Sequence, residues 1–285
     1  MALSKVIQGC MTYGAWGKQL NTKAIAQRIE ALVESGITSF DHADIYGDYT
    51  TEAEFGKALK ISAVDRADLQ IISKCGLQLP SKERGNNLKH YQYDTDYIIA
   101  QAKQSIANLG CEYLDVFLLH RPSPLMQKDE IAKAISSLKS EGLIKAFGVS
   151  NFSLSQIDYL RSSVDISYNQ IQVSLTHLEA LENDHLYGLS QRQIQPMAWQ
   201  PLGDVLKLKD SHRLKACVQE LASNYKLTEA QLAIAFLRKL PFDISPVLGT
   251  TSIDRANLAL AAMEVELELQ DWFKIYEASR GHEVA

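Results

Sequence analysis

The chain has 285 residues, of which 46% are hydrophobic and 22% are charged, a composition typical of a folded globular protein and not of a disordered or fibrous one. Its 34 acidic and 29 basic residues are scattered along the sequence and give a net charge of -5, so no basic stripe marks it as a nucleic acid partner. The longest apolar runs, residues 232–237 and 258–263, have six residues each, whereas crossing a bilayer takes about twenty, so no membrane partner is expected.

Short β-rich apolar segments alternate with longer segments of helical period from one end of the chain to the other. This alternation indicates parallel βαβ units. Strands are predicted at residues 6–11, 37–41, 69–75, 113–120, 146–150, 167–172, 194–199 and 244–249. Helices are predicted at residues 22–35, 51–59, 95–109, 128–140, 154–162, 184–192, 213–224 and 230–239. The predicted helix caps are Asn21, Asp94 and Ser153 at N-termini, and Gly36, Gly110 and Gly142 at C-termini.

Eight strands that are each followed by a helix, without any linker-like segment, predict an α/β fold: a single (β/α)8 TIM barrel domain over residues 1–285. A doubly wound sheet is the alternative. That fold has fewer strands and, when it binds dinucleotides, a GxGxxG turn after the first strand, a spacing that Gly9, Gly14 and Gly17 do not make.

The four cysteines, Cys10, Cys75, Cys111 and Cys217, stand far apart and form neither a CxxC pair nor a zinc-like Cys/His cluster. Free thiols, a reducing compartment and no metal site are therefore expected. Residues 1–18 lack the seven or more consecutive apolar residues of a signal peptide, which makes the cytoplasm the expected location.

Residues 76–93 form a long polar connection, broken by Gly and Pro, after the third predicted strand. Connections of this length in compact domains are usually functional or disordered. A loop that gates a substrate and a mobile surface insertion are both open interpretations.

Four ionisable residues lie at the carboxyl ends of predicted strands or in the loop directly after one, where barrels of this type place their catalytic groups. Each of them alone has a structural explanation, such as a capped turn or a packed ring. Together they would converge, because neighbouring strand ends lie only about 5 Å apart. The four candidate catalytic residues are Asp41, Tyr46, Lys74 and His120.

This set of residues can donate a proton to a developing alkoxide. The ammonium of Lys74 would stabilise a Tyr46 phenolate and lower the pKa of the phenol, while Asp41 would keep Lys74 charged and oriented. His120 would hydrogen-bond the substrate oxygen or share the tyrosine proton. Because the set contains no nucleophile and no metal, a hydride from a nicotinamide cofactor fits the second half of the reaction.

Four segments resemble the aldo-keto reductase superfamily, and within it the bacterial oxidoreductases that have a long polar loop after strand three. They are FDHADIYG at 40–47, ISKCG at 72–76, LLHRP at 118–122 and GVSNF at 148–152. The resemblance extends over nearly the whole chain. It implies a reductase of aldehydes or ketones in which Tyr46 is the general acid, Lys74 and Asp41 tune it, and His120 positions the carbonyl.

The resemblance also implies where NADPH or NADP+ would bind. Ser150, Asn151 and Gln170 would hydrogen-bond the nicotinamide carboxamide, and Trp199 would stack on the ring. Residues 200–203 match the pyrophosphate loop of the family. The full set of expected cofactor residues is Gly9, Cys10, Met11, Asp41, Ser150, Asn151, Gln170, Trp199, Gln200, Leu202, Gly249, Thr250, Thr251 and Arg255.

Two positions depart from the commoner family pattern. Asp204 stands where a small residue often lies beside the pyrophosphate, and its carboxylate would repel that group unless it turns outward. Gly249 stands where many members have lysine, so recognition of the 2′-phosphate of NADPH would rest on Arg255, in the first turn of a helix that begins near residue 253, and on the threonines.

Two other functions remain alternatives. One is an NADP-binding sensor with little turnover, like the potassium-channel β-subunits, which are similar in fold. The other is an aldolase-type barrel in which Lys74 forms a Schiff base.

The sequence does not identify the small-molecule carbonyl substrate. Its pocket is expected to be shaped by residues 76–93, the residues after Gln172 and the C-terminal segment 272–285. Further pocket candidates are Trp16, Tyr49 and His177. A monomer is expected.

Overall fold

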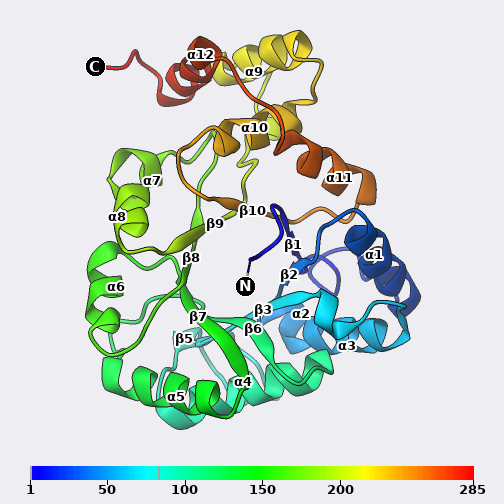
Figure 1. Ribbon diagram of the computed structural model, residues 1–285, viewed down its shortest axis with the longest axis vertical. Coiled ribbons are helices and arrows are strands. Elements are labelled where there is room, and N and C mark those ends of the chain that lie inside the picture. The colour runs from blue at the N-terminus through cyan, green and yellow to red at the C-terminus, as the bar shows by residue number, and fades with distance from the viewer. Residues whose placement is uncertain (1, 83) are drawn as a thin grey trace.

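The computed structural model describes residues 2–82 and 84–285, and its main body is a closed barrel of eight parallel strands surrounded by helices (Figure 1). The strands follow the order β1-β10-β9-β8-β7-β6-β3-β2 around the barrel. The predicted (β/α)8 barrel is therefore confirmed. The barrel strands are β1 (Ile7–Gly9), β2 (Ser39–Asp41), β3 (Gln70–Cys75), β6 (Leu114–Leu119), β7 (Ile144–Ser150), β8 (Tyr168–Gln172), β9 (Gln195–Trp199) and β10 (Ser245–Leu248).

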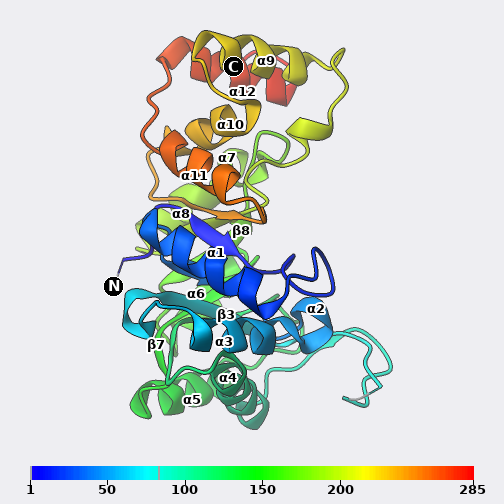
Figure 2. The same cartoon turned by 90° about the vertical axis from the view of Figure 1, so that its right-hand side faces the viewer.

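Helices cover the outside of the barrel. They are α1 (Thr22–Glu34), α3 (Thr51–Ile61), α4 (Thr95–Leu109), α5 (Lys128–Ser140), α6 (Leu154–Arg161), α8 (His185–Gln191), α10 (Glu229–Arg238) and α11 (Ile253–Ala262), with the single turns α2 (Tyr46–Tyr49) and α7 (Glu179–Glu182) in loops. Two more, α9 (Arg213–Asn224) and α12 (Leu269–Arg280), pack on each other at one end of the molecule, beyond α10 (Figures 1 and 2). Among the helices of residues 2–82 and 84–285, none combines the length and apolarity needed to cross a membrane.

The predicted N-caps are confirmed in detail. The side chains of Asn21, Asp94 and Ser153 each accept a hydrogen bond from the backbone amide three residues further on. The C-terminal glycines Gly36, Gly110 and Gly142 all have positive φ, the conformation that ends a helix and that a residue with a Cβ adopts only at a cost.

Alternation along the strands divides the interior into two layers. On β3, Ile71 packs in the outer layer between strands and helices, whereas Ile72 packs in the inner layer inside the barrel. With a period of two, Lys74 follows Ile72 toward the inside, and Cys75 follows Ile71 into the outer layer. The middle of the barrel interior is filled by Ile7, Ile72, Val116, Leu118, Tyr168, Met197 and Val247.

The long connection after β3 is partly regular. Residues 76–93 contain a small antiparallel pair, β4 (Leu77–Gln78) and β5 (His90–Tyr91), and this segment projects beside α2 (Figure 2). The expectation that the C-terminal segment 272–285 shapes the substrate pocket is wrong, because none of its residues lines the large cavity described below. This segment belongs mostly to α12, where Trp272 stacks on Phe236 at 4.8 Å between ring centroids.

Candidate active site

Lys74 lies at the centre of a buried polar cluster in the barrel mouth. Its Nζ is 2.7 Å from each carboxylate oxygen of Asp41, 2.7 Å from the carbonyl oxygen of His42 and 3.1 Å from Oη of Tyr46. The side chain of Lys74 is completely buried, and that of Asp41 is nearly so. The structure therefore brings together three of the four predicted catalytic residues through one ammonium group.

Protonation in this cluster differs in one respect from the sequence-based prediction. Burial alone lowers the pKa of Lys74, but Asp41 and Tyr46 outweigh it and hold that pKa above its ordinary value, so the lysine is charged. Burial raises the pKa of Tyr46, and the opposing charge of Lys74 compensates only in part. The predicted lowering of the Tyr46 pKa is therefore wrong in its net direction, because desolvation of the phenolate exceeds the attraction of Lys74.

The backbone after β2 places Tyr46 over the barrel mouth. Tyr46 begins the single turn α2, in which Gly47 has φ 59° and Asp48 has φ 55°. A Cβ on Gly47 would lie 2.4 Å from Oγ1 of Thr51, so only glycine fits there. The Tyr46 ring meets His120 edge-on, with ring centroids 6.1 Å apart.

His120 follows β6 and lines the same cavity as Tyr46. Burial, together with the charges of Lys74 and Arg121, lowers the pKa of His120 well below its ordinary value, so the imidazole is neutral. Nδ1 is enclosed without a hydrogen-bond partner among residues 2–82 and 84–285, whereas Nε2 is not enclosed in this way. The ring therefore has Nε2 available toward the cavity.

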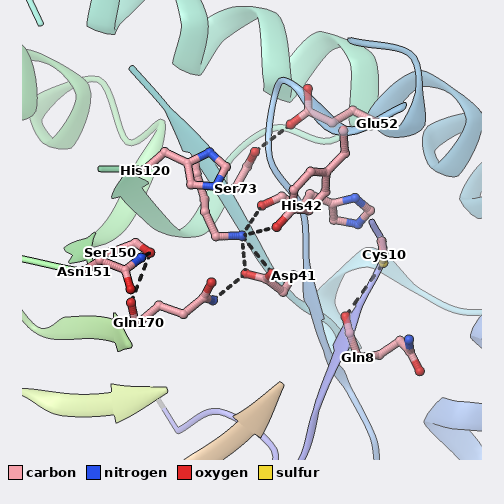
Figure 3. Close-up of polar contacts among 12 residues, drawn as sticks. Gln8, Cys10, Asp41, His42, Glu52, Ser73, His120, Ser150, Asn151 and Gln170 are labelled. Atoms are coloured by element: carbon pink, nitrogen blue, oxygen red, sulfur yellow. Dashed lines mark hydrogen bonds and ion pairs between the residues drawn. The ribbon is translucent and has the colours of Figure 1, made fainter. Parts of the chain in front are cut away.

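A chain of hydrogen bonds connects the catalytic cluster with the residues expected at the nicotinamide (Figure 3). Gln170 Nε2 donates to Oδ1 of Asp41 at 2.8 Å, and Ser150 Oγ donates to the carbonyl oxygen of Gln170 at 3.0 Å. Asn151 Nδ2 donates to Ser150 Oγ at 2.9 Å, and Trp199 Nε1 donates to Oδ1 of Asn151 at 2.9 Å. Strands β2, β7, β8 and β9 thus contribute to one network.

A cavity of about 1350 Å³ extends from this network to the N-terminus of α11. Most of the predicted catalytic and cofactor residues line it: Gly9, Met11, Asp41, Tyr46, His120, Gln170, Trp199, Gln200, Leu202, Gly249, Thr250, Thr251 and Arg255. Four do not. Lys74 and Ser150 are buried behind its wall, Asn151 is half-buried and is not part of the lining, and the side chain of Cys10 is buried in the outer core layer.

The far end of the cavity is the loop before α11. Ser252 caps the helix by accepting a hydrogen bond from the amide of Arg255, whose side chain reaches the cavity wall. From behind, Arg28 of α1 donates hydrogen bonds to the carbonyl oxygens of Thr250 and Thr251. A helix N-terminus with exposed hydroxyls and an arginine suits a phosphate group.

Asp204 is turned away from the predicted pyrophosphate position. Its Oδ1 lies 2.8 Å from Nζ of Lys207, and both side chains are more than half exposed. Asp204 does not line the cavity, whereas Lys207 does. The Asp204 carboxylate pairs with Lys207 outside the cavity lining. This geometry therefore does not direct it at a pyrophosphate, and the repulsion between the two groups does not arise.

Sequence reasoning missed several residues of the cavity wall, among them Thr12, Lys18, Lys207, Glu229 and Arg121. Arg121 carried a usable signal, because it stands next to His120 at the carboxyl end of a strand. Of the three further pocket candidates, Trp16 lines the cavity, whereas Tyr49 and His177 do not. Across the described part of the chain, no three His, Cys, Asp or Glu residues form a group suited to a metal ion.

Comparison with known proteins gives matches over nearly the whole chain. Two curated bacterial relatives are similar at this length: the protein named oxidoreductase YdhF of Escherichia coli (strain K12), 35% identical over 99% of this chain and 95% of the relative, and the 6-dehydroglucose reductase of Agrobacterium fabrum, 34% identical over 100% of this chain and 97% of the relative.

Solved structures support the fold. A thermostable aldo-keto reductase, Tm1743, solved with the inhibitor epalrestat, superimposes with a TM-score of 0.82 at 22% identity over 97% of this chain and 95% of that one. An aldo/keto reductase of Klebsiella pneumoniae, solved with NADP and acetate, gives 0.78 at 22% identity over 99% and 92%. The sequence model of the aldo/keto reductase family matches residues 5–280, and the chain therefore belongs to that family.

Proposed function

We propose that the protein is an NADPH-dependent reductase that converts aldehydes or ketones to alcohols, with Tyr46 as the general acid. One observation carries this proposal: Nζ of Lys74, bound to both oxygens of Asp41, lies 3.1 Å from Oη of Tyr46. The family match and the oxidoreductase and reductase names of the relatives support it.

The residues present fit a nicotinamide dinucleotide. At about 1350 Å³ the cavity exceeds the roughly 300–1,000 Å³ of ordinary small-molecule sites, as a cofactor together with a substrate requires. At one end, Trp199 and Gln170 would hold the nicotinamide, with Ser150 and Asn151 fixing their orientation from behind. When bound, the reduced cofactor supplies the hydride.

The other end of the cavity would take the phosphates. The loop 249–251 and the amides of the first turn of α11 would hold phosphate oxygens. Gly249 leaves this loop open, because a Cβ added there would meet nothing within 4 Å. The neighbouring arginine, Arg255, would pair with the 2′-phosphate that distinguishes NADPH from NADH.

The chain's own groups move and orient the proton. The phenol of Tyr46 is protonated in the resting site and would donate its proton to the carbonyl oxygen as that oxygen becomes negative. The resulting phenolate would be stabilised by Lys74, which Asp41 keeps charged. Neutral His120 would orient the carbonyl oxygen by donating from Nε2.

The Schiff-base alternative is disfavoured by the state of Lys74. A Schiff base requires a neutral amine that a carbonyl can reach. Lys74 is fully buried, does not line the cavity and has a raised pKa. Borohydride trapping in the presence of substrate tests this directly, and a covalent adduct on Lys74 would overturn the reductase.

The decisive experiment compares the parent protein with Tyr46→Phe. NADPH binding is followed by fluorescence, and NADPH consumption is measured with aromatic, aliphatic and dicarbonyl compounds and with 6-dehydroglucose, which two relatives carry in their names. Tyr46→Phe is expected to bind NADPH like the parent and to lose about a hundred- to ten-thousandfold in kcat. Tyr49→Phe is a matched control, because Tyr49 follows closely in the chain without lining the cavity.

Two outcomes would contradict the proposal. Failure of the parent to bind NADPH removes the cofactor assignment. Tight binding without turnover of any compound favours the alternative of an NADP-binding sensor. The 2′-phosphate assignment has its own test, because Arg255→Ala should weaken NADPH binding far more than NADH binding. Equal losses of affinity for the two cofactors would refute the assignment.

A further inference from the structure

Arg121 lies directly after His120 at the carboxyl end of β6 and forms part of the cavity wall near Tyr46. It is half-buried, and its guanidinium carbon is 5.9 Å from the ring centroid of Trp199. The guanidinium of Arg121 takes no part in the proposed proton donation, although it lies at the end of the cavity where the carbonyl would react.

The hydrogen bonds of the Arg121 side chain within the described residues all use one nitrogen. Nη1 donates to the carbonyl oxygen of His120 at 2.6 Å and to Oγ of Ser150 at 3.1 Å. Nε and Nη2 of Arg121 make no hydrogen bond within the described residues. They are not among the atoms buried without a partner, so both remain accessible. Nε and Nη2 together form one edge of the guanidinium, an edge that matches the two oxygens of a carboxylate.

The backbone of Arg121 is held in place from the opposite side. Oη of the buried Tyr93 donates to the Arg121 carbonyl oxygen and accepts from the Arg121 amide at 3.3 Å. Tyr93 itself packs against Gly76, where an added Cβ would lie 1.7 Å from Cε1 of the ring. Because backbone and Nη1 are already fixed, binding an anion would cost little further ordering of this arginine.

Among the described residues, the charges around Arg121 provide no counterion. Within residues 2–82 and 84–285, no carboxylate lies within 4 Å of its guanidinium nitrogens. Asp41 is bound to Lys74, and His120 is neutral. Burial lowers the pKa of Arg121 below its ordinary value, as expected for a charge that has lost water and gained no partner. A bound anion would supply that partner.

We infer that Arg121 is a specificity-determining residue that binds a carboxylate of the carbonyl substrate through Nε and Nη2. The substrate class is then a short aldehyde or ketone that carries a carboxylate a few bonds from the carbonyl carbon. This inference rests on the proposed reductase function, since it assigns the second contact point of the same substrate.

The kinetic test uses two aldehydes of equal chain length. Succinic semialdehyde ends in a carboxylate and butyraldehyde ends in a methyl group, and kcat/KM is measured for both with NADPH. In the parent the ratio should favour the carboxylate by about tenfold or more, mainly through KM. Arg121→Met should bring the ratio to about one, whatever happens to the absolute rates. Arg121→Lys, which keeps the charge but loses the planar edge, should lie between them.

Lys89→Met is the matched control. The charge of Lys89 also acts on His120, but the residue is exposed and does not line the cavity. If Arg121 is the recognition point, Lys89→Met keeps most of the parent ratio. Each of three results would overturn the assignment. They are a kcat/KM ratio near one in the parent, an unchanged ratio in Arg121→Met, and a ratio that falls to about one in Lys89→Met but not in Arg121→Met.

A binding measurement separates this inference from the reductase proposal. The affinity of the NADP+-loaded protein for 4-hydroxybutyrate and for 1-butanol is measured by calorimetry, which needs no turnover. Tighter binding of 4-hydroxybutyrate that Arg121→Met removes and Arg121→Lys partly restores supports the carboxylate site even if no aldehyde is reduced. Equal binding of the two compounds by the parent refutes the site even if butyraldehyde is reduced rapidly.

Discussion

Gln170 Nε2 donates a hydrogen bond of 2.8 Å to Oδ1 of Asp41, which joins β8 to β2 inside the mouth of the barrel (Figure 3). These strands are not neighbours in the barrel, so the bond reaches across it. The same carboxylate oxygen lies 2.7 Å from Nζ of Lys74. A residue expected at the cofactor is therefore also a hydrogen-bond partner of the proton-donating cluster.

Gln170→Glu replaces this amide with a group of nearly the same shape that carries a negative charge above its pKa. Two carboxylates would then face each other in a buried site, so the pKa of the introduced group should be raised. We expect the free energy of unfolding at pH 8 to fall by about 2 kcal/mol or more, and the loss to shrink as pH falls and the introduced carboxyl becomes protonated.

Gln172→Glu, on the same strand, is the control. Gln172 is half-buried and bonds to Gln200, away from Asp41, so its change should cost within about 0.5 kcal/mol at either pH. Chemical denaturation at pH 8 and pH 5 measures both variants. A Gln170→Glu protein as stable as the parent at pH 8 would show that this hydrogen bond does not matter for stability.

Arg28→Met tests the support of the loop before α11. Arg28 is buried, and its guanidinium donates to the carbonyl oxygens of Thr250 and Thr251. Without these bonds the loop should lose order, and the Kd for NADPH should rise about tenfold, a change of about 1.4 kcal/mol. Fluorescence titration measures the Kd, and hydrogen exchange of the amides at 250–252 should accelerate.

The surface pair of Arg192 and Asp158 provides the comparison for Arg28. Arg192→Met removes an arginine of the same size far from this loop. It should leave both the NADPH affinity and the exchange rates near the parent values. A Kd for Arg28→Met within about twofold of the parent contradicts the expected support.

Gly76→Ala should be strongly destabilising. Gly76 has φ 101°, and an added Cβ would lie 1.7 Å from Cε1 of Tyr93. Backbone strain and overpacking together should lower the free energy of unfolding by about 3 kcal/mol or more. Gly85→Ala separates the two causes, because Gly85 has φ 71° with nothing within 4 Å of an added Cβ, and only the strain of about 1–2 kcal/mol applies. Equal losses in both variants would remove the role of the Tyr93 contact.

His42 should make the stability depend on pH. Burial, and then the charge of Lys74, lowers the pKa of His42 from 6.5 to about 3. As pH falls below about 6.5, the unfolded chain takes up a proton that the folded chain does not, so stability is lost as pH falls. The loss from this residue is about 2 kcal/mol at pH 5.

Between pH 8 and pH 5, the free energy of unfolding of His42→Leu should therefore fall by about 2 kcal/mol less than that of the parent. His177→Leu, which removes a partly exposed histidine, should behave like the parent. Denaturation curves at the two pH values measure all three proteins. An identical drop in His42→Leu and the parent would show that the buried imidazole does not contribute.

The architecture was predictable because it depends on local pattern. Alternating β-rich and helical segments indicated the eight barrel strands, and short-range rules located the caps at Asn21, Asp94 and Ser153. The same reasoning placed Asp41, Lys74 and His120 at strand ends, where the parallel barrel brings them together. The register that joins Gln170 to Asp41 across the barrel could not be derived in this way, because these strands are distant in the chain and not adjacent in the sheet.

The sequence by itself determined the fold class, the family and the identity of the groups in the barrel mouth, since these follow from periodicity, motif and residue type. Only the tertiary structure decided the net direction of the Tyr46 pKa, because it depends on how completely water is excluded around Lys74 and the phenol. It also decided that Cys10 faces the outer core and that the side-chain hydrogen bonds of Arg121 within the described residues use Nη1 alone. Burial and charge balance are sums over residues far apart in the chain, which no local pattern records.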